Sequence, residues 1–199
     1  MIRNVVGIAA ITLFAAGCAI RPTIPGTSVR WDERRNVLLA LDEWQARGRI
    51  AVKYRDDGGQ GNIQWQQTGT QARIRLNGPF GAGAYELLWN DDQVSITDKN
   101  GAVSADYTGP DAAERLIRER VGWSFPADST RYWILGIANP DFPAQERFDT
   151  EGWLAGIEQN GWVIAYDGFA DRSGTWMPRR IVMENEQARV RVVVDRWLF

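Results

Sequence analysis

Side chains that could carry acid–base or nucleophilic chemistry are sparse in this sequence. The chain has no His, so the commonest general base and the commonest metal ligand are both missing. Acid pairs occur at Asp56/Asp57 and Asp91/Asp92, but both fall in predicted turns, where Asp is favoured by hydrogen bonds to the backbone. The glycines around Gly58 lack the Lys and the Ser or Thr of a phosphate-binding loop. We therefore expect no enzyme activity, no metal site and no cofactor.

The one cysteine, Cys18, is the remaining reactive side chain, and its position suggests a chemistry for it. Residues 1–17 carry one positive charge, Arg3, followed by an apolar run from Val5 to Ala16 that is too short for a comfortable membrane span. This pattern is typical of a signal peptide. Its end, AAGC, resembles the lipobox at which bacterial processing attaches a diacylglyceryl group to the Cys thiol and cleaves before it. The Leu usual three positions before the Cys is Ala15 here.

Lipidation would make Cys18 the anchor of the mature chain. Several acyl chains hold a protein stably on a membrane, where a single chain binds only marginally. Ala19 follows the Cys, and the lipoprotein sorting rule implies that a residue other than Asp there permits export to the outer membrane. Residues 18–28 are rich in Pro, Thr and Gly and predict a lipidated, flexible tether, which leaves residues 29–199 as the folded domain.

The composition fits that single domain. With 199 residues, 44% of them hydrophobic, the chain can bury a sizeable core. Its formal net charge of -2 gives no attraction to polyanions, so nucleic acid is not an expected partner. The 10 Trp residues suit either a lipid-facing cavity or a large aromatic core. We expect a monomer.

Hydrophobic periodicity predicts one helix and then a run of strands. From Trp31 to Glu43, Val37, Leu38 and Leu41 share one helical face. From Trp44 onward the period changes to two, and the short connections rich in Gly, Asn and Asp imply antiparallel neighbours. The predicted strands cover residues 49–54, 62–68, 72–77, 84–90, 94–97 and 103–107.

Helical patterns return in the middle of the chain. One helix follows residue 110 and ends at Gly122, and a second covers residues 128–135 and ends at Gly136, after which a loop is expected. Strands resume over residues 152–158, 162–169, 179–184 and 188–198. This order predicts a mainly β fold, in which a curved antiparallel sheet forms an incomplete, half-open barrel with helices on its open side.

The alternation defines one dry face of the predicted sheet. Side-chain parity identifies this face but does not decide whether the space above it is packed or hollow. The opposite face carries Arg47, Arg49, Lys53, Arg73 and Arg75, which could meet an acidic protein or simply face the solvent. The residues assigned to the dry face are Ile50, Val52, Ile63, Trp65, Ile74, Leu76, Tyr85 and Leu87.

Several short blocks make the chain similar to the LolB family over nearly its whole length. Each block is weakly specific by itself, but together and in this order they are improbable by coincidence. The blocks are WQARGRIAV (44–52), IQWQQTG (63–69), LNGPFGAG (76–83), RYWILGIANP (131–140), EQNGWVIAYDGF (158–169) and MPRRIVM (177–183), with Trp197 near the end.

The resemblance implies a function without catalysis. It implies that helices act as a lid over a hydrophobic cavity, lined by the dry-face residues, that holds the acyl chains of a lipoprotein. It further implies a receptor on the outer membrane that faces the periplasm, accepts lipoproteins from the periplasmic carrier LolA and inserts them into the membrane.

The resemblance also singles out the loop from Gly78 to Gly83 as a membrane insertion loop, with Pro79, Phe80 and Gly81 at its centre. The family's common apolar residue there is Leu, so Phe80 differs in identity but not in polarity. Its small neighbours cannot bury a large aromatic ring locally. Phe80 could therefore dip into a bilayer, or it could fold back as a plug in the mouth of the barrel.

Two other functions are compatible with parts of the sequence. An outer-membrane lipoprotein with a packed core could act as an assembly scaffold, and it would bind no acyl chains. A small-lipid hydrolase would need a nucleophile with a base, and the sequence has no His to serve as one.

Overall fold

The computed structural model describes residues 28–78, 83–121, 125–172 and 174–199. Its dominant feature is an 11-stranded sheet whose neighbouring strands are all antiparallel. In spatial order the strands are β6 (Val103–Thr108), β5 (Gln93–Asp98), β4 (Tyr85–Trp89), β3 (Gln71–Asn77), β2 (Asp57–Thr68), β1 (Glu43–Tyr54), β13 (Ala188–Leu198), β12 (Arg180–Glu184), β9 (Trp162–Tyr166), β8 (Leu154–Gln159) and β7 (Ala144–Phe148).

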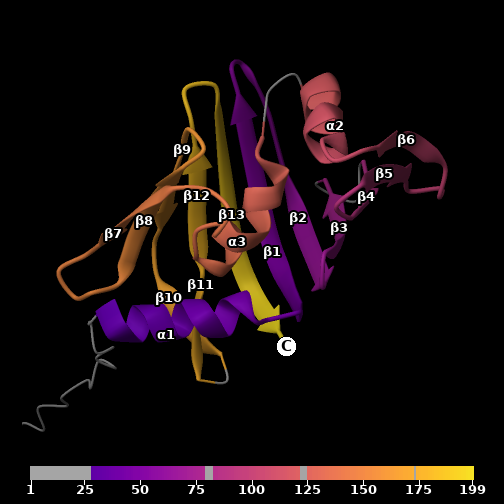
Figure 1. The fold of residues 1–199 in the computed structure, drawn as a ribbon. Helices are drawn as coiled ribbons and strands as arrows, with labels where there is room; N and C mark the ends of the chain where they lie inside the picture. The colour runs from indigo at the N-terminus through magenta and orange to yellow at the C-terminus, as the bar shows by residue number, and fades with distance from the viewer. Residues whose placement is uncertain (1–27, 79–82, 122–124, 173) are drawn as a thin grey trace, which may run out of the picture.

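The sheet is strongly curved and is not closed into a barrel, because β6 and β7 remain as its two edges (Figure 1). The helices α1 (Ser28–Leu39), α2 (Ala112–Val121) and α3 (Ala127–Leu135) lie on its concave side. A separate hairpin, β10 (Phe169–Arg172) with β11 (Thr175–Pro178), lies near α1. The expected mainly β fold, a curved antiparallel sheet left open and covered by helices, is confirmed.

The centre of the sheet depends on a glycine in β1. The register between β1 and β13 shifts between Arg47 and Gly48, which marks a β-bulge. A Cβ at Gly48 would lie 2.9 Å from the carbonyl carbon of Val193 and closer still to its oxygen, so only glycine fits there. The bulge keeps the residues on both sides of it in phase, because Ala46 pairs with Trp197 and Ile50 with Val192, and all four point to the concave side.

The core lies between the concave face and the helices, in two clusters. The large cluster includes the completely buried Trp133, Ile137, Ile157, Ile164 and Ile181, each 0% exposed. The small cluster packs α2 onto β5 and is formed by Val94, Ala112, Ala113, Leu116 and Ala127. Every residue of both clusters lies between Trp31 and Trp197, so a chain that begins at Ser28 contains both cores and folds as a unit of its own.

A row of indole rings runs across the sheet, from β13 through β1 and β2 to β4. Trp197 and Trp65 flank Trp44, with ring centroids 5.7 Å and 5.5 Å from it, and Trp89 follows 6.3 Å from Trp65. The indole nitrogens of Trp197 and Trp65 donate to the carbonyl oxygen of Pro178 at 3.0 Å and to the side chain of Gln67 at 2.9 Å. These four aromatic residues therefore pack tightly while their buried polar atoms stay satisfied.

The structure differs from the sequence-based expectation in three elements. Helix α1 covers Ser28–Leu39 rather than residues 31–43, because β1 already begins at Glu43 and pairs there with Thr68. The expected loop after α3 contains the edge strand β7, which pairs with β8. The segment from Phe169 to Pro178 forms the β10–β11 hairpin, whose strands are too short for a clear alternation.

An apolar cavity under the helices as candidate functional site

A cavity of about 150 Å³ lies between the concave face of the sheet and the helices α2 and α3. Strands from both halves of the sheet form its floor, and the two helices form its roof. Its lining consists of Ile50, Ile63, Trp65, Ile74, Leu76, Leu87, Trp89, Val94, Met183, Val190 and Val192 from the sheet, with Ala113, Leu116, Ile117, Phe125, Ala127, Thr130 and Ile134 from the helices and their flanks.

The cavity is chemically suited to hydrocarbon. No charged side chain occurs among the described residues that line it. The Thr130 hydroxyl donates to the Pro126 carbonyl oxygen at 3.0 Å, and the Trp65 indole nitrogen donates to Gln67, so neither offers a free polar group to the interior. An apolar cavity of this size stays dry and takes apolar molecules, because water inside it would find no hydrogen-bond partners.

Most of the sequence-predicted dry-face residues meet at this cavity. Val52 packs against the large core cluster without lining the cavity. Tyr85 lies at the start of β4 and is 48% exposed, so its ring stands outside the enclosed space. The predicted residues that line the cavity are Ile50, Ile63, Trp65, Ile74, Leu76 and Leu87.

The sequence did not identify the residues that form the roof of the cavity, or those of β12 and β13 that form its far wall. Leu116 and Ile117 on α2 belong to the apolar stripe that predicted this helix, and that stripe was the available signal for a covering surface. Met183, Val190 and Val192 come from β12 and β13, more than 90 residues away in the sequence from the floor at Trp89. The pairing of β13 with β1 and the curvature of the sheet bring these two halves together.

The helix α3 is fixed firmly to the sheet. Its Trp133 is completely buried, and the indole nitrogen donates to the Gln159 side chain at 2.8 Å. The Tyr166 hydroxyl donates to the Trp133 carbonyl oxygen at 2.8 Å. Burial raises the pKa of Tyr166 far above its ordinary value, so this hydroxyl keeps its proton and remains a donor.

The carboxyl end of α3 is held by α1. Gly136 ends the helix in the left-handed conformation, with φ 74°. The Arg34 guanidinium donates to the carbonyl oxygens of Leu135 at 2.8 Å, Gly136 at 3.0 Å and Trp176 at 2.8 Å. Burial lowers the pKa of Arg34 to about 10, which still leaves it a cation at neutral pH. A cation at a helix C-terminus also stabilises the helix dipole.

The helix α2 is held far more weakly. It packs mainly through small side chains, Ala112 and Ala113, and through Leu116. Its polar ties to β6 are exposed: the Tyr107 hydroxyl donates to Glu119 at 2.6 Å, and Arg115 donates to the carbonyl oxygen of Thr108. Such exposed contacts contribute little stability, so the roof has one rigid helix and one weakly attached helix.

Three of the predicted sites lie outside the described residues. They are Cys18, the signal segment before it, and the centre of the insertion loop at Pro79, Phe80 and Gly81. Of the loop's flanks, Gly83 adopts a left-handed conformation with φ 65°, which turns the chain into β4.

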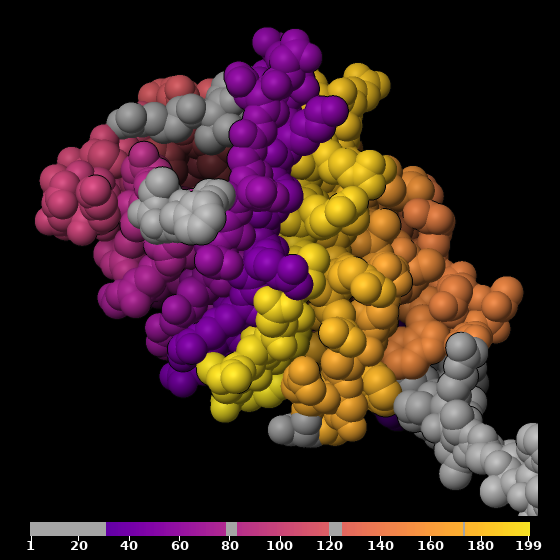
Figure 2. Space-filling view, turned by 180° about the vertical axis from the view of Figure 1, so that it is seen from behind, coloured from indigo at the N-terminus to yellow at the C-terminus, as the bar shows by residue number. Residues whose placement is uncertain are grey.

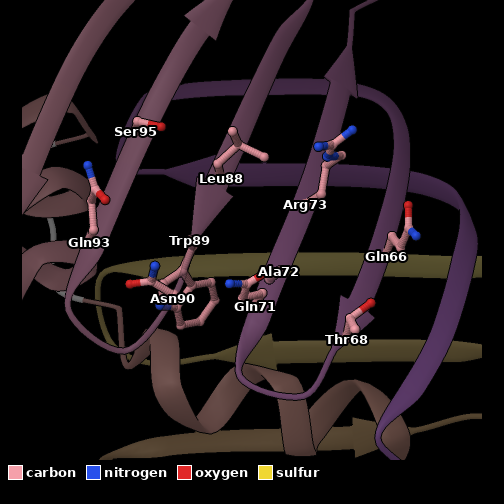
Figure 3. Close-up of a pocket in the computed structure, with 10 residues that line it drawn as sticks. All are labelled: Gln66, Thr68, Gln71, Ala72, Arg73, Leu88, Trp89, Asn90, Gln93 and Ser95. Atoms are coloured by element: carbon pink, nitrogen blue, oxygen red, sulfur yellow. The ribbon is translucent and has the colours of Figure 1, made fainter.

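A second hollow, of about 600 Å³, lies over the convex side of β2 to β5 (Figure 3). The side chains of Gln66, Arg73, Leu88 and Ser95 point to the same side of the sheet, and they are cross-strand neighbours in one row. Three of these four are polar, so this groove does not suit an acyl chain.

Asp91 and Asp92 lie in the turn between β4 and β5, and Asp56 lies in the turn between β1 and β2, as expected. Asp57, expected in the same turn, is instead the first residue of β2 and pairs with Tyr54. Desolvation, with smaller contributions from Asp91 and Asp141, raises the pKa of nearby Asp128.

Within the described parts of the chain no group of three or more acids or thiols could hold a metal ion. A search of the same residues found no helix long and apolar enough to cross a membrane.

Comparisons with known proteins agree with this architecture. Residues 42–197 match the family model described as outer membrane lipoprotein LolB. An outer-membrane lipoprotein LolB of Pseudomonas fluorescens is 32% identical over 188 residues, which are 92% of this chain and 90% of the relative. One from Stutzerimonas stutzeri is 31% identical over 192 residues, covering 94% of this chain and 91% of the relative.

Solved structures with little sequence identity share the fold. A LolA superfamily protein from Nitrosomonas europaea, 10% identical, has a TM-score of 0.52 and covers 83% of this chain and 90% of its own. A DUF1329 family protein from Desulfovibrio piger, 9% identical, has a TM-score of 0.53 and covers 88% and 94%. The chain therefore belongs to the family of the outer membrane lipoprotein LolB, and its role is lipoprotein localisation at the outer membrane.

Proposed function

We propose that this protein is a receptor that accepts lipoproteins from the periplasmic carrier LolA and inserts them into the outer membrane. The observation that carries the proposal is the apolar cavity under the helices, which is walled by hydrocarbon on all described sides. Acyl chains gain about 0.8 kcal/mol for each CH₂ group removed from water. A multiply acylated cargo would leave for the solvent far too slowly, so it needs a sheltered path from one protein to the next.

The cavity is small for the ligand proposed here. At about 150 Å³ it matches the engineered cavities that bind a benzene-sized molecule, and it is too small for a long acyl chain. Uptake therefore requires the roof to move away from the floor. A packed scaffold would have no reason to keep this space empty, since filling it with side chains would add stability.

We infer that α2 is the moving part of the roof and α3 the fixed part. Separating α2 from the sheet breaks the small cluster around Ala113 and Leu116 and two exposed polar contacts. Separating α3 would break the buried hydrogen bond between Trp133 and Gln159 and the bond from the Tyr166 hydroxyl to the Trp133 carbonyl oxygen. The first separation costs much less free energy than the second, so cargo enters between α2 and the strands β4 and β5.

Delivery to the membrane is assigned to the insertion loop and the lipid anchor. Cys18 would carry the acyl anchor, and Phe80, between Pro79 and Gly81, would reach the bilayer interface. A side chain of this kind can lower the barrier for the cargo to leave the cavity. Hand-off without a nucleotide requires that cargo affinity rise from the carrier to this receptor and from the receptor to the bilayer.

A transfer assay tests the proposal. The chain beginning at Ser28 is mixed with LolA loaded with a lipidated cargo, and then with liposomes. We expect the wild type to take the cargo and pass it on, and Phe80→Glu to take the cargo but fail to deposit it. Ile117→Gln, which puts a polar amide into the cavity, should weaken uptake about tenfold, whereas its matched control Arg118→Gln, on the exposed side of α2, should not.

The assay also separates this function from a packed scaffold. If the wild-type domain takes nothing from a carrier that releases cargo normally, the receptor function is wrong and the scaffold becomes the better account. If Ile117→Gln and Arg118→Gln take up cargo equally well, the cavity is not the acyl site.

A further inference from the structure

The convex face of the sheet concentrates positive charge in a chain whose net charge is -2. This face is turned toward the viewer in Figure 2, where β1 and β2 (indigo to purple) and β12 and β13 (yellow) form one broad surface. Basic side chains occupy its outward positions on three strands, β1, β3 and β13. We use the name basic face for the exposed residues Arg47, Lys53, Arg73, Arg191 and Arg196.

The cations of the basic face have no acidic partners among the described residues. Neighbouring cations do: Arg49 pairs with Asp195 at 3.2 Å, and Arg75 pairs with Glu86 at 2.5 Å. Glu86 and Asp195 are thus already paired, and the exposed Glu43 at the start of β1 makes no described ion pair, so the five cations of the basic face outnumber that acid. Salt screens charges that lie more than about one Debye length apart, so the strongest repulsion is between Arg47 and Arg196, which are direct register partners.

Like charges also face each other directly across strands. Arg47 is the register partner of Arg196. Lys53 is the register partner of Arg189, which also pairs with Glu184 at 3.3 Å. Directly opposed like charges destabilise a sheet. A fold that keeps such pairs on its central strands loses stability, and an anionic surface against this face would reverse that repulsion.

The arrangement fits an extended anionic surface better than a small anion. The cations are spread over β1, β3 and β13 rather than gathered in one pocket, and no described cavity collects them. A protein of an outer-membrane lipoprotein family works beside a phospholipid surface. Four acids, Asp91, Asp92, Asp128 and Asp141, lie together with a single cation, Arg131, around a separate hollow. A membrane would therefore attract one side of the domain and repel the other.

We propose that the basic face binds the phosphate headgroups of anionic phospholipids and thereby orients the domain on the membrane. This contact is electrostatic and separate from the lipid anchor and from the acyl cavity. It rests on the family's place at the membrane and not on the transfer mechanism, so the failure of one leaves the other standing.

Vesicle binding tests the proposal. The chain beginning at Ser28, which has no acyl anchor, is sedimented with phosphatidylcholine vesicles that do or do not contain phosphatidylglycerol. We expect binding only to the anionic vesicles and a decrease as salt is raised. Because each cation near an anionic surface changes the partition coefficient about fivefold, Arg47→Gln/Arg196→Gln should bind about 25-fold more weakly.

A matched control tests whether vesicle binding depends on where the cations lie or only on the net charge of the domain. Lys99→Gln/Arg118→Gln removes two exposed cations from the β5–β6 turn and from α2, and it should bind nearly as well as the wild type. Lys53→Gln/Arg191→Gln serves as an independent second variant on the basic face. All variants are first checked by thermal unfolding, where relief of the opposed charges should leave Arg47→Gln/Arg196→Gln at least as stable as the wild type.

Two results would overturn the proposal. One is equal binding to neutral and anionic vesicles, or equal loss in the basic-face and control variants. The other is a basic-face variant that keeps its vesicle binding but no longer takes cargo from the carrier, because the face would then bind the carrier protein instead of lipid.

Discussion

At the scale of single residues, the structure depends on a few buried polar side chains that hold the aromatic core in one arrangement. Gln159 is 3% exposed, yet its side chain bonds to Trp133 and to the backbone of Asn139 and Phe142. Tyr166 adds the bond to the Trp133 carbonyl oxygen. These bonds fix α3 in place, and a fixed α3 gives the cavity one rigid wall.

Removing the Tyr166 hydroxyl should be measurable. In Tyr166→Phe the Trp133 carbonyl oxygen keeps only its bond from the Gly136 amide. We expect a loss of about 1 kcal/mol in the free energy of unfolding, measured with urea. Tyr85→Phe is the control, because Tyr85 is 48% exposed and its hydroxyl bonds to no described residue, and it should change stability by only a few tenths of a kcal/mol. Equal losses in both variants would contradict the assigned role of the Tyr166 bond.

At the scale of elements, α2 and α3 differ in how firmly they are attached, and this difference is the basis for proposing that the small cavity widens without unfolding of the domain. The C-terminus of α3 meets Arg34, Pro178 and Phe169 around Gly136, where a Cβ would lie 2.8 Å from the Pro178 Cγ and 3.3 Å from an Arg34 nitrogen. In the part of the chain that the structure describes, no comparable set of buried contacts holds α2. The two helices therefore differ in how firmly they are attached although they are similar in length.

Gly136 supplies a prediction with a close internal control. Gly136 and Gly161 share φ 74°, but a Cβ at Gly161 would meet nothing within 4 Å. Gly161→Ala should cost about 1 kcal/mol for the left-handed backbone alone, whereas Gly136→Ala should cost about 2 kcal/mol because it also displaces Pro178 and Arg34. Thermal or urea unfolding measures both. If Gly161→Ala costs as much as Gly136→Ala, the packing at the end of α3 does not matter.

The weak attachment of α2 predicts a local change without a global one. Glu119→Ala removes the acceptor of the Tyr107 hydroxyl and should speed hydrogen exchange of the α2 amides about threefold while leaving those of α3 unchanged. Arg118→Ala is the control, since it changes the same helix at a neighbouring exposed position. Equal acceleration in α2 and α3 would mean that the two helices open together.

At the scale of the whole molecule, the sequence predicted the sheet and its helical cover because strand alternation and helix caps are local signals. Ile63, Trp65, Ile74 and Leu87 show the alternation clearly and do line the cavity. Tyr85 shares their parity, but it lies at a strand end where the cavity no longer extends. Parity reports which face a residue is on, and not how far along a strand the enclosed space reaches.

Features that depend on pairing between strands far apart in the chain could not be predicted from the sequence. The far wall of the cavity at Met183 and Val190 depends on β13 pairing with β1, and the edge strand β7 depends on β8. Alternation predicted three residues of the basic face, Arg47, Lys53 and Arg73, but only the pairing of β13 with β1 adds Arg191 and Arg196 to it. These contacts bring together residues that are far apart in the sequence, so a local sequence pattern cannot predict them.

The most direct test of the account is whether the cavity binds an acyl chain. Trp65 and Trp89 line it, so a palmitate brominated in mid-chain should quench tryptophan fluorescence of the chain beginning at Ser28. We predict saturable quenching that falls in Trp65→Phe and Trp89→Phe but not in Trp153→Phe, whose ring stacks on Phe169 away from the cavity. Absence of quenching, or equal quenching in all three variants, would contradict an acyl-binding cavity in this protein.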